Sequence, residues 1–236
     1  MERIDKLLAK ELNIPRSAAK ALLKQKRVTL NGAPVLFADA KYGEGDTVAL
    51  DGKALSGRQY VYIMLNKPQG YVSATEDQNE KTVLELLPEE MRRKGLFPAG
   101  RLDKDTTGFL LLTDDGAFAH RILSPKKHIE KTYLARLDKP IDDAVIADFE
   151  QGMALGDEML LPAKLRAVNN DNTLAEVKIS QGIYHQVKRM FQKHGITVLA
   201  LQRTAMGKLP LDPSLREGEC RYLSEDEVEK IIDKSI

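Results

Sequence analysis

The chain has 236 residues, of which 42% are hydrophobic and 30% are charged, as in ordinary globular proteins. It has no low-complexity tract and no apolar run near the ~20 residues of a membrane helix. We expect no signal peptide. The single cysteine, Cys220, excludes an internal disulfide framework and a cysteine-rich metal site. We therefore expect a cytoplasmic protein.

Charge is unevenly distributed along the chain, although the net charge is only +1. Residues 1–58 carry 11 basic and 7 acidic side chains, hence +4, whereas the rest carries 25 basic and 28 acidic ones, hence −3. A positive excess at one end is typical of contact with a polyanion. We predict two domains, residues 1–58 and residues 59–236, with the polar stretch 51–59 as a linker at their junction.

The first predicted domain consists of two helices followed by strands. Ile4, Leu7, Leu8 and Leu12 recur at helical spacing, and Pro15 ends that pattern. The next segment, 16–27, has five basic residues and no acidic one, and its cations at 16, 20 and 24 share one helical face. Asn31-Gly32 then predicts a hairpin. A basic helix beside a tight hairpin indicates a phosphate-contacting surface, although a solvated face is the alternative.

The second predicted domain alternates short strands and helices. Strands are expected in 60–67, 108–113, 129–137 and 173–180, and helices in 114–124, 141–153 and from Ser224 onward. Helical crossovers are too irregular for a doubly wound parallel sheet. We therefore predict an α+β fold with a mixed, mainly antiparallel sheet flanked by helices.

Several familiar sites are excluded. The chain has no P-loop, no G-x-G-x-x-G, no G-x-S-x-G and no Cys or His pair at metal spacing. The four histidines, at 120, 128, 185 and 194, are dispersed, and for each a surface or helix-end role is expected. An enzyme with this sequence would use carboxylates, tyrosines and cations, without a cofactor or a metal.

Asp103 is the first candidate among those side chains. It lies between Arg101 and Lys104 and precedes a turn, Thr106-Thr107-Gly108, and a fully apolar strand. A loop fixed by a buried strand positions a side chain accurately. The alternative is a turn-capping aspartate, which explains Asp105 better, and Asp114 is expected to cap the following helix.

Two further segments carry candidate chemistry. From Lys178 to Leu211 there are six Lys or Arg residues and no acidic residue, which indicates a phosphate-binding surface or a cation for a distant carboxylate. His185, Lys188 and Arg189 would share one face of a helix there. Tyr133, in "EKTY", begins an alternating strand, and core packing is its alternative role.

Together these segments resemble the RsuA family of RNA pseudouridine synthases. The matching blocks are "LNKPQGYV", "GRLDKDTTGFLLLTDDG", "EKTY" and "GIYHQVKRMF", and they follow a segment that resembles the S4 RNA-binding module. The resemblance covers essentially the whole chain. "HRI-x-SP" and "EKTY" are more similar to the branch that acts on small-subunit (16S) ribosomal RNA than to the large-subunit branches.

The resemblance implies roles for particular residues. Asp103 would be the catalytic carboxylate, Tyr133 the active-site tyrosine, and Lys188 the basic partner of the aspartate, with Arg189 as the second candidate for that partner. Many relatives outside this branch have arginine at the position of Lys188, and lysine supplies a point charge instead of a bidentate fork. No cofactor and no metal are implied, and the expected partner of the monomer is ribosomal RNA, alone or in a partly assembled small subunit. The residues expected to bind RNA are Arg16, Lys20, Lys24, Arg27, Arg101, Gln186 and Arg189.

Three alternatives remain at this stage. The enzyme could act on large-subunit (23S) ribosomal RNA, or the protein could be a non-catalytic S4-type assembly factor. A glycosidase would need two carboxyl groups roughly 5–9.5 Å apart, for which Asp103 and Asp105 are candidates. The chain has no tryptophan to serve as a sugar platform. Convergence of Asp103, Tyr133 and Lys188 on one cleft would favour the pseudouridine synthase.

Overall fold

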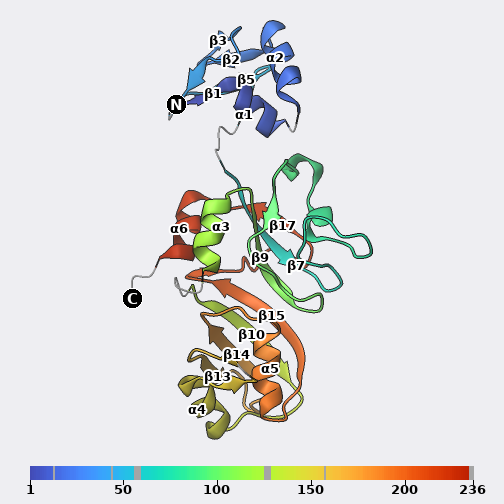
Figure 1. The fold of residues 1–236 in the computed structure, drawn as a ribbon, viewed down its shortest axis with the longest axis vertical. Helices are drawn as coiled ribbons and strands as arrows, with labels where there is room; N and C mark the ends of the chain where they lie inside the picture. The colour runs from blue at the N-terminus through green and yellow to red at the C-terminus, as the bar shows by residue number, and fades with distance from the viewer. Residues whose placement is uncertain (13, 44, 56–59, 125–128, 157, 234–236) are drawn as a thin grey trace. The chain divides into compact units, whose positions relative to one another are not determined.

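The computed structural model describes residues 1–12, 14–43, 45–55, 60–124, 129–156 and 158–233. The chain divides into two compact units (Figure 1). One consists of Met1–Tyr60 with Glu89–Leu96, and the other of Val61–Pro88 with Phe97–Ile236. The predicted boundary between residues 58 and 59 lies outside the described residues. No pattern in the sequence predicted that Glu89–Leu96 belongs with the first unit.

The first unit packs two helices on short strands. Helices α1 (Ile4–Glu11) and α2 (Arg16–Lys24) were both predicted, and their apolar faces meet over β2 and β5. The core consists of Ile4, Leu7, Leu8, Ala19, Leu23, Val28, Tyr42 and Val48. The strands are β1 (Glu2–Arg3) with β4 (Lys41–Tyr42), and the sheet β3-β2-β5-β6, formed by Ala33–Pro34, Val28–Leu30, Val48–Leu50 and Lys53–Ala54.

Two tight turns organise that sheet. Asn31 and Gly32 have φ of 50° and 82°, so the predicted hairpin between β2 and β3 is confirmed. Asp51 and Gly52 also have positive φ, 49° and 80°, and join β5 to β6. The prediction that 51–59 is a linker is therefore wrong for residues 51–54, because Asp-Gly is as strong a hairpin signal as Asn-Gly.

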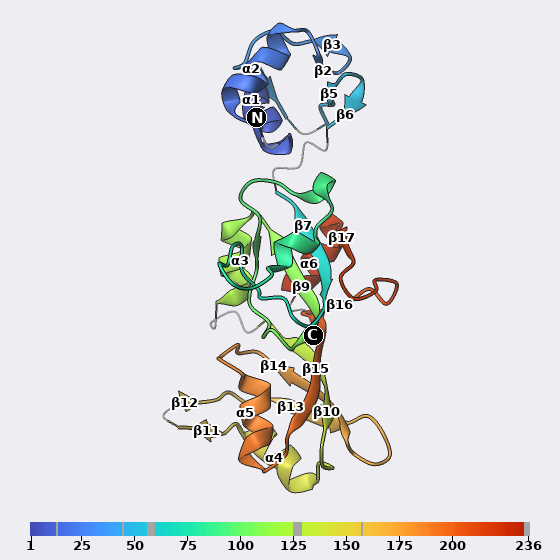
Figure 2. The same ribbon diagram turned by 90° about the vertical axis from the view of Figure 1, so that its right-hand side faces the viewer.

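The second unit is built on one twisted sheet (Figures 1 and 2). This sheet has nine strands within the described residues. The main order is β13-β14-β10-β15-β9-β7-β17, with β16 paired to β15 and β8 to β9. The pair β15–β9 is parallel, and the other pairs among the described strands are antiparallel. The predicted mixed, mainly antiparallel sheet is confirmed. The strands are β7 (Tyr62–Lys67), β8 (Phe97–Pro98), β9 (Thr107–Thr113), β10 (Lys131–Leu137), β13 (Lys164–Ala167), β14 (Leu174–Ile179), β15 (Val198–Met206), β16 (Leu209–Pro210) and β17 (Cys220–Tyr222).

Helices cover the two halves of this sheet. Helices α3 (Gly116–Leu123) and α6 (Glu225–Ile232) share a core with β7 and β9. Helices α4 (Asp143–Gln151) and α5 (Gln186–Lys193) lie together on the other half (Figure 2). The rings of Phe149 on α4 and Phe191 on α5 are 5.0 Å apart. The 3-10 helices Val83–Leu86 and Glu89–Met91 and the hairpin β11 (Ala154–Leu155)–β12 (Glu158–Met159) complete the elements. No helix in the described part of the chain is long and apolar enough to cross a membrane.

The helix caps test the sequence signals in detail. The Ser224–Glu227 capping box of α6 is present as predicted. The prediction that Asp114 caps α3 is wrong by one residue. Asp115 accepts from the Phe118 amide at 2.9 Å, whereas Asp114 accepts from the amide of Val61 at 2.9 Å. Two adjacent aspartates are equivalent in a sequence pattern, and the long-range partner of Asp114 separates their roles.

Candidate active site

Asp103 lies on the loop that joins β8 to β9, and main-chain contacts hold this loop closely. The Thr106 amide donates to the Asp103 carbonyl at 3.1 Å. The Leu102 side chain is buried, and its amide donates to the Ser73 hydroxyl at 3.0 Å. The Asp103 carboxylate itself remains 27% exposed, so a fixed backbone presents an accessible carboxylate.

Lys67, the last residue of β7, holds the same loop through hydrogen bonds to its main chain. Its side chain is fully buried, and Nζ donates to the carbonyls of Asp103 at 3.1 Å and Thr106 at 2.9 Å. Burial lowers the pKa of Lys67 to about 8, although the nearby charges of Asp105 and Asp103 act in the opposite direction. No role was predicted for Lys67, although a cation at the end of a buried strand is a signal that the sequence contains.

Lys188 reaches Asp103 from α5. Its Nζ is 3.1 Å from Oδ2 of Asp103 and 2.6 Å from Oδ1 of Asp105. Burial alone would lower the pKa of Lys188, but the hydrogen bonds and charges of the two aspartates outweigh it and raise this pKa. Burial alone would raise the pKa of Asp105, but the hydrogen bond and the charge of Lys188 outweigh it and lower this pKa. The lysine is therefore a fixed cation between two carboxylates.

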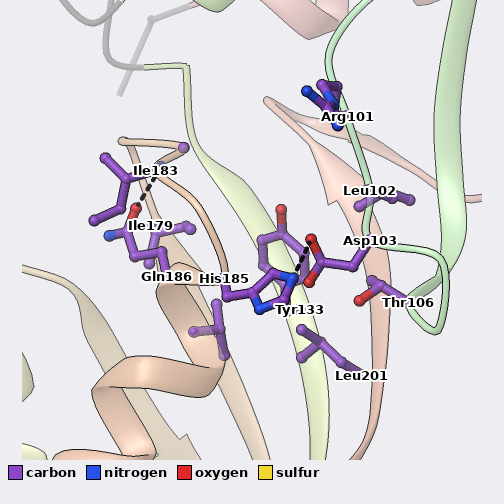
Figure 3. Close-up of a pocket in the computed structure, with 12 residues that line it drawn as sticks. Arg101, Leu102, Asp103, Thr106, Tyr133, Ile179, Ile183, His185, Gln186 and Leu201 are labelled. Carbon is purple, nitrogen blue, oxygen red and sulfur yellow. Dashed lines mark hydrogen bonds and ion pairs between the residues drawn. The ribbon is translucent and has the colours of Figure 1, made fainter. Parts of the chain in front are cut away.

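His185 is the second contact of the Asp103 carboxylate. Its Nε2 lies 3.4 Å from Oδ1 of Asp103, and the two side chains point toward each other (Figure 3). His185 occupies the N-cap position of α5 without a side-chain capping hydrogen bond, and its φ of 51° is a left-handed conformation that is uncommon for residues other than glycine. The predicted helix-end role is correct, but the contact with the aspartate was missed.

Asp103 and His185 border a pocket of about 70 Å³ between the Asp103 loop and the start of α5 (Figure 3). Lys188 is not among its lining residues and reaches Asp103 from outside the pocket. Asp103 and Tyr133 both line it, and Tyr133 is only 8% exposed. Apolar walls come from Leu102, Ile179, Ile183, Val187 and Leu201. The Oγ1 of Thr106, also in the lining, is buried and has no hydrogen-bond partner among the described residues. The arrangement combines a charged carboxylate, an aromatic ring and an apolar slot.

The other predicted RNA-binding residues of this unit differ in their surroundings. Arg101 is exposed and lines the pocket. Gln186 is buried, and its Oε1 accepts from the Ile183 amide at 3.3 Å, so its side chain closes a turn. Arg189 lies 3.0 Å from Glu158 on β12. Lys188, and not the second candidate Arg189, is therefore the cation beside Asp103.

The basic residues of the first unit also separate into two groups. Arg16, Lys20 and Lys24 are exposed along α2, and none of them has an ion pair among the described residues. Arg27, in contrast, donates to Asp51 at 3.0 Å. Three of the four predicted cations thus form one exposed face, and the fourth is neutralised by an aspartate.

Replacement of Lys188 is expected to impair the site. Lys188→Met removes the cation that Asp103 and Asp105 share, and the like charges of the two carboxylates are then no longer offset by it. We expect kcat of the reaction that the sequence resemblance implies to fall by about 10²-fold. Losses of this size are usual when one group that stabilises charge in the transition state is removed. Lys193→Met, which removes an exposed cation at the C-terminal end of α5, is the matched control and should retain more than half of the activity. Equal losses in both variants would contradict a specific role for Lys188.

Lys131, near the site on β10, predicts a pH dependence of stability. Burial and the charge of Arg203 lower its pKa to about 8 from 10.5. Between pH 8 and 10.5, Lys131 is mostly protonated in the unfolded chain and mostly neutral in the folded protein. The free energy of unfolding therefore rises with pH in this range, by at most about 1.4 kcal/mol per pH unit from this group. Lys131→Met should flatten that rise in urea titrations from pH 7.5 to 10, whereas replacement of the exposed Lys164 should not. An unaltered slope in Lys131→Met would contradict the assignment.

Sequence comparison identifies the family. The profile described as "RNA pseudouridylate synthase" matches residues 61–193, and the "S4 domain" profile matches residues 2–48. The chain belongs to the RNA pseudouridine synthase family. The predicted resemblance is confirmed, including the S4 module at the N-terminal end.

Known pseudouridine synthases resemble this chain over nearly its whole length. "Uncharacterized RNA pseudouridine synthase YtzG" of Bacillus subtilis (strain 168) is 47% identical, and the match covers 96% of each chain. "Ribosomal small subunit pseudouridine synthase A" of Escherichia coli (strain K12) is 43% identical over 98% of this chain and 100% of that protein. A solved structure, "Crystal structure of pseudouridylate synthase", has a TM-score of 0.68 and 39% identity over 98% of this chain and 100% of that one. The protein is therefore an isomerase that acts on RNA.

Proposed function

We propose that this pseudouridine synthase converts a specific uridine of small-subunit (16S) ribosomal RNA to pseudouridine, with Asp103 as its catalytic carboxylate. The observation that carries the proposal is the position of Asp103, which faces the pocket beside Tyr133 while Lys188 lies 3.1 Å from its Oδ2. The relatives named ribosomal small subunit pseudouridine synthase A, at 43% identity, support the choice of RNA.

The chemistry accounts for the residue types in the pocket. Isomerisation breaks the N1–C1′ bond, turns the base and joins C5 to C1′. N1 then carries a proton and C5 loses one, so no electrons are gained or lost overall. An ionised Asp103 can attack C1′ or the base covalently, or remove a proton from the sugar. Each route needs an anionic carboxylate, and the ammonium group of Lys188 lies 3.1 Å from Oδ2 of Asp103.

The target base must leave its stack to reach Asp103, and the pocket is suited to receive it. Tyr133 offers an aromatic face, and the apolar side chains around it exclude water. Thr106 Oγ1, which is buried without a partner among the described residues, is available for the polar edge of uracil. Arg101, exposed beside the pocket, would bind a flanking phosphate.

The exposed cations of α2 predict how the first unit binds RNA. Replacement of Arg16, Lys20 and Lys24 with glutamine should weaken binding of ribosomal RNA and reduce the slope of log K against log salt by about 2, since each phosphate contact contributes roughly 0.7–0.9. Filter-binding titrations at several salt concentrations measure this slope. Lys41 and Lys53, exposed elsewhere in the unit, provide a control double variant. A triple variant with the wild-type slope would show that this helix does not contact RNA.

Substrate choice can be tested directly. Purified protein is incubated with small-subunit or large-subunit ribosomal RNA labelled with tritium at C5 of uridine, and as a third arm with partly assembled small subunits. We expect tritium release from small-subunit RNA, and the corresponding pseudouridine should be missing from cells that lack the protein. Release from large-subunit RNA alone would overturn the proposed substrate. Binding without release in any arm would favour a non-catalytic assembly factor.

A further inference from the structure

Tyr184 and His185 form an aromatic stack at the edge of the pocket. Their ring centroids are 3.8 Å apart, and the ring planes differ by 17°. Tyr184 is nevertheless 75% exposed, so the ring face that is turned away from His185 is open to solvent. A single exposed aromatic residue needs no explanation. This one differs because the ring on which it stacks lines the pocket that holds Asp103.

Hydrogen bonds hold the main chain that carries the two stacked rings. The turn that carries Tyr184 is closed by the Gln186 amide, which donates to the Ile183 carbonyl at 3.3 Å. Arg189 donates to the carbonyl of Tyr184 at 3.3 Å. His185, in its left-handed conformation, is fixed beside the Asp103 carboxylate. A backbone outlier that points one ring at the pocket and supports another ring outside it is typical of a binding surface. Little ordering entropy would be lost when a ligand stacks on it.

We propose that the outer face of Tyr184 binds the base of a nucleotide next to the target uridine. The inference rests on the proposed function, because extrusion of the uridine is what leaves its neighbour without a stacking partner. Aromatic side chains stack on single-stranded bases of any identity. His185 contacts both subsites, since it borders the pocket and carries Tyr184 on its ring.

The charge around the stack fits a nucleotide ligand. Tyr184 lies within the segment Lys178–Leu211, which has six basic and no acidic residues. Arg101, across the pocket from α5, is exposed and available to the phosphate between the two bases (Figure 3). The nearby Glu158 is paired with Arg189, which offsets its repulsion of phosphate.

Kinetics with small-subunit ribosomal RNA test this subsite. Tyr184→Leu removes the ring and should raise KM about 10-fold, within the range of base–aromatic stacking, while kcat changes less than about twofold. Tyr184→Phe keeps the ring and should behave like the wild type. Tyr222→Leu, which alters an exposed tyrosine on the opposite edge strand β17, should leave both constants unchanged. A Tyr184→Leu variant with the wild-type KM would overturn the inference. A variant in which both kcat and the melting temperature fall would also overturn it, because that result indicates a structural role for the ring.

A second measurement does not depend on turnover. An oligouridine that carries one 2-aminopurine loses fluorescence when that base stacks on an aromatic ring. With protein at a saturating concentration, the wild type, Tyr184→Phe and Tyr222→Leu should quench it, and Tyr184→Leu should not. Equal quenching by Tyr184→Leu would overturn the inference. Quenching by a wild-type protein that releases no tritium would reject the proposed function and leave the stacking site standing.

Discussion

Replacement of Asp103 with asparagine is expected to abolish pseudouridine formation and to leave RNA binding intact. The amide has nearly the same shape but cannot act as an anionic nucleophile or base, so turnover should fall at least about 10³-fold. The loop should keep its position, because Lys67 and Thr106 bind the main-chain carbonyl of residue 103 and not its side chain. Tritium release measures turnover, and a gel-shift titration measures binding.

Asp105 provides the matched control for this experiment. It lies on the same loop and shares Lys188, at 2.6 Å, but its side chain is 69% exposed and it does not line the pocket. Asp105→Asn should therefore retain activity within about fivefold, as expected for a surface ion-pair partner. If Asp103→Asn kept more than a tenth of the wild-type rate, Asp103 would be removed from the chemistry. If only Asp105→Asn were inactive, the two roles would be exchanged.

The Asp103 loop could be predicted because its signals are local. The apolar run 109–112 predicts a buried strand, and the polar turn before it predicts a side chain held at the strand end. The structure has the corresponding strand, Thr107–Thr113, directly after the loop. The Ser224 cap of α6 and the Asn31-Gly32 hairpin were predictable for the same reason. In each case the deciding interactions lie within about four residues.

Lys67 and His185 could not be assigned in this way, because their functions come from distant partners. Lys67 binds carbonyls 36 and 39 positions further along the chain, and nothing near it in the sequence shows which carbonyls those are. His185 was correctly placed at a helix end. Its left-handed conformation, which aims the imidazole at Asp103, is set by the turn before α5 and is not visible in residue spacing.

Adjacent residues on α5 show a second limit of pattern analysis. Spacing predicts that Lys188 and Arg189 share a face, and both were candidates to pair with Asp103. Successive side chains on a helix are about 100° apart, which is enough for their ends to reach different neighbours. Lys188 contacts the Asp103 loop, whereas Arg189 contacts Glu158 on the β11–β12 hairpin. The positions of the hairpin and of the loop therefore determine which of the two cations pairs with Asp103.

Gly108→Ala is expected to give the largest loss of stability among the single substitutions considered. Gly108 has φ of 97°, and a Cβ added there would clash with the Arg203 carbonyl oxygen and lie 2.9 Å from its amide nitrogen. Both atoms are backbone, so relief requires β9 and β15 to separate where they form their parallel pair. We expect a loss of more than about 3 kcal/mol in the free energy of unfolding, a large part of the total for one domain.

Gly116→Ala is the control, because Gly116 begins α3 without positive φ, and no atom lies within 4 Å of the added Cβ. It should be neutral or stabilising by up to about 1 kcal/mol, since alanine restricts the unfolded chain. Urea titrations compare the two variants with the wild type. A Gly108→Ala protein as stable as Gly116→Ala would mean that the strands can separate without cost. Asp103, five residues before Gly108, would then be carried by a loop whose supporting strand can move, and the close β9–β15 contact could not be what keeps the carboxylate in place.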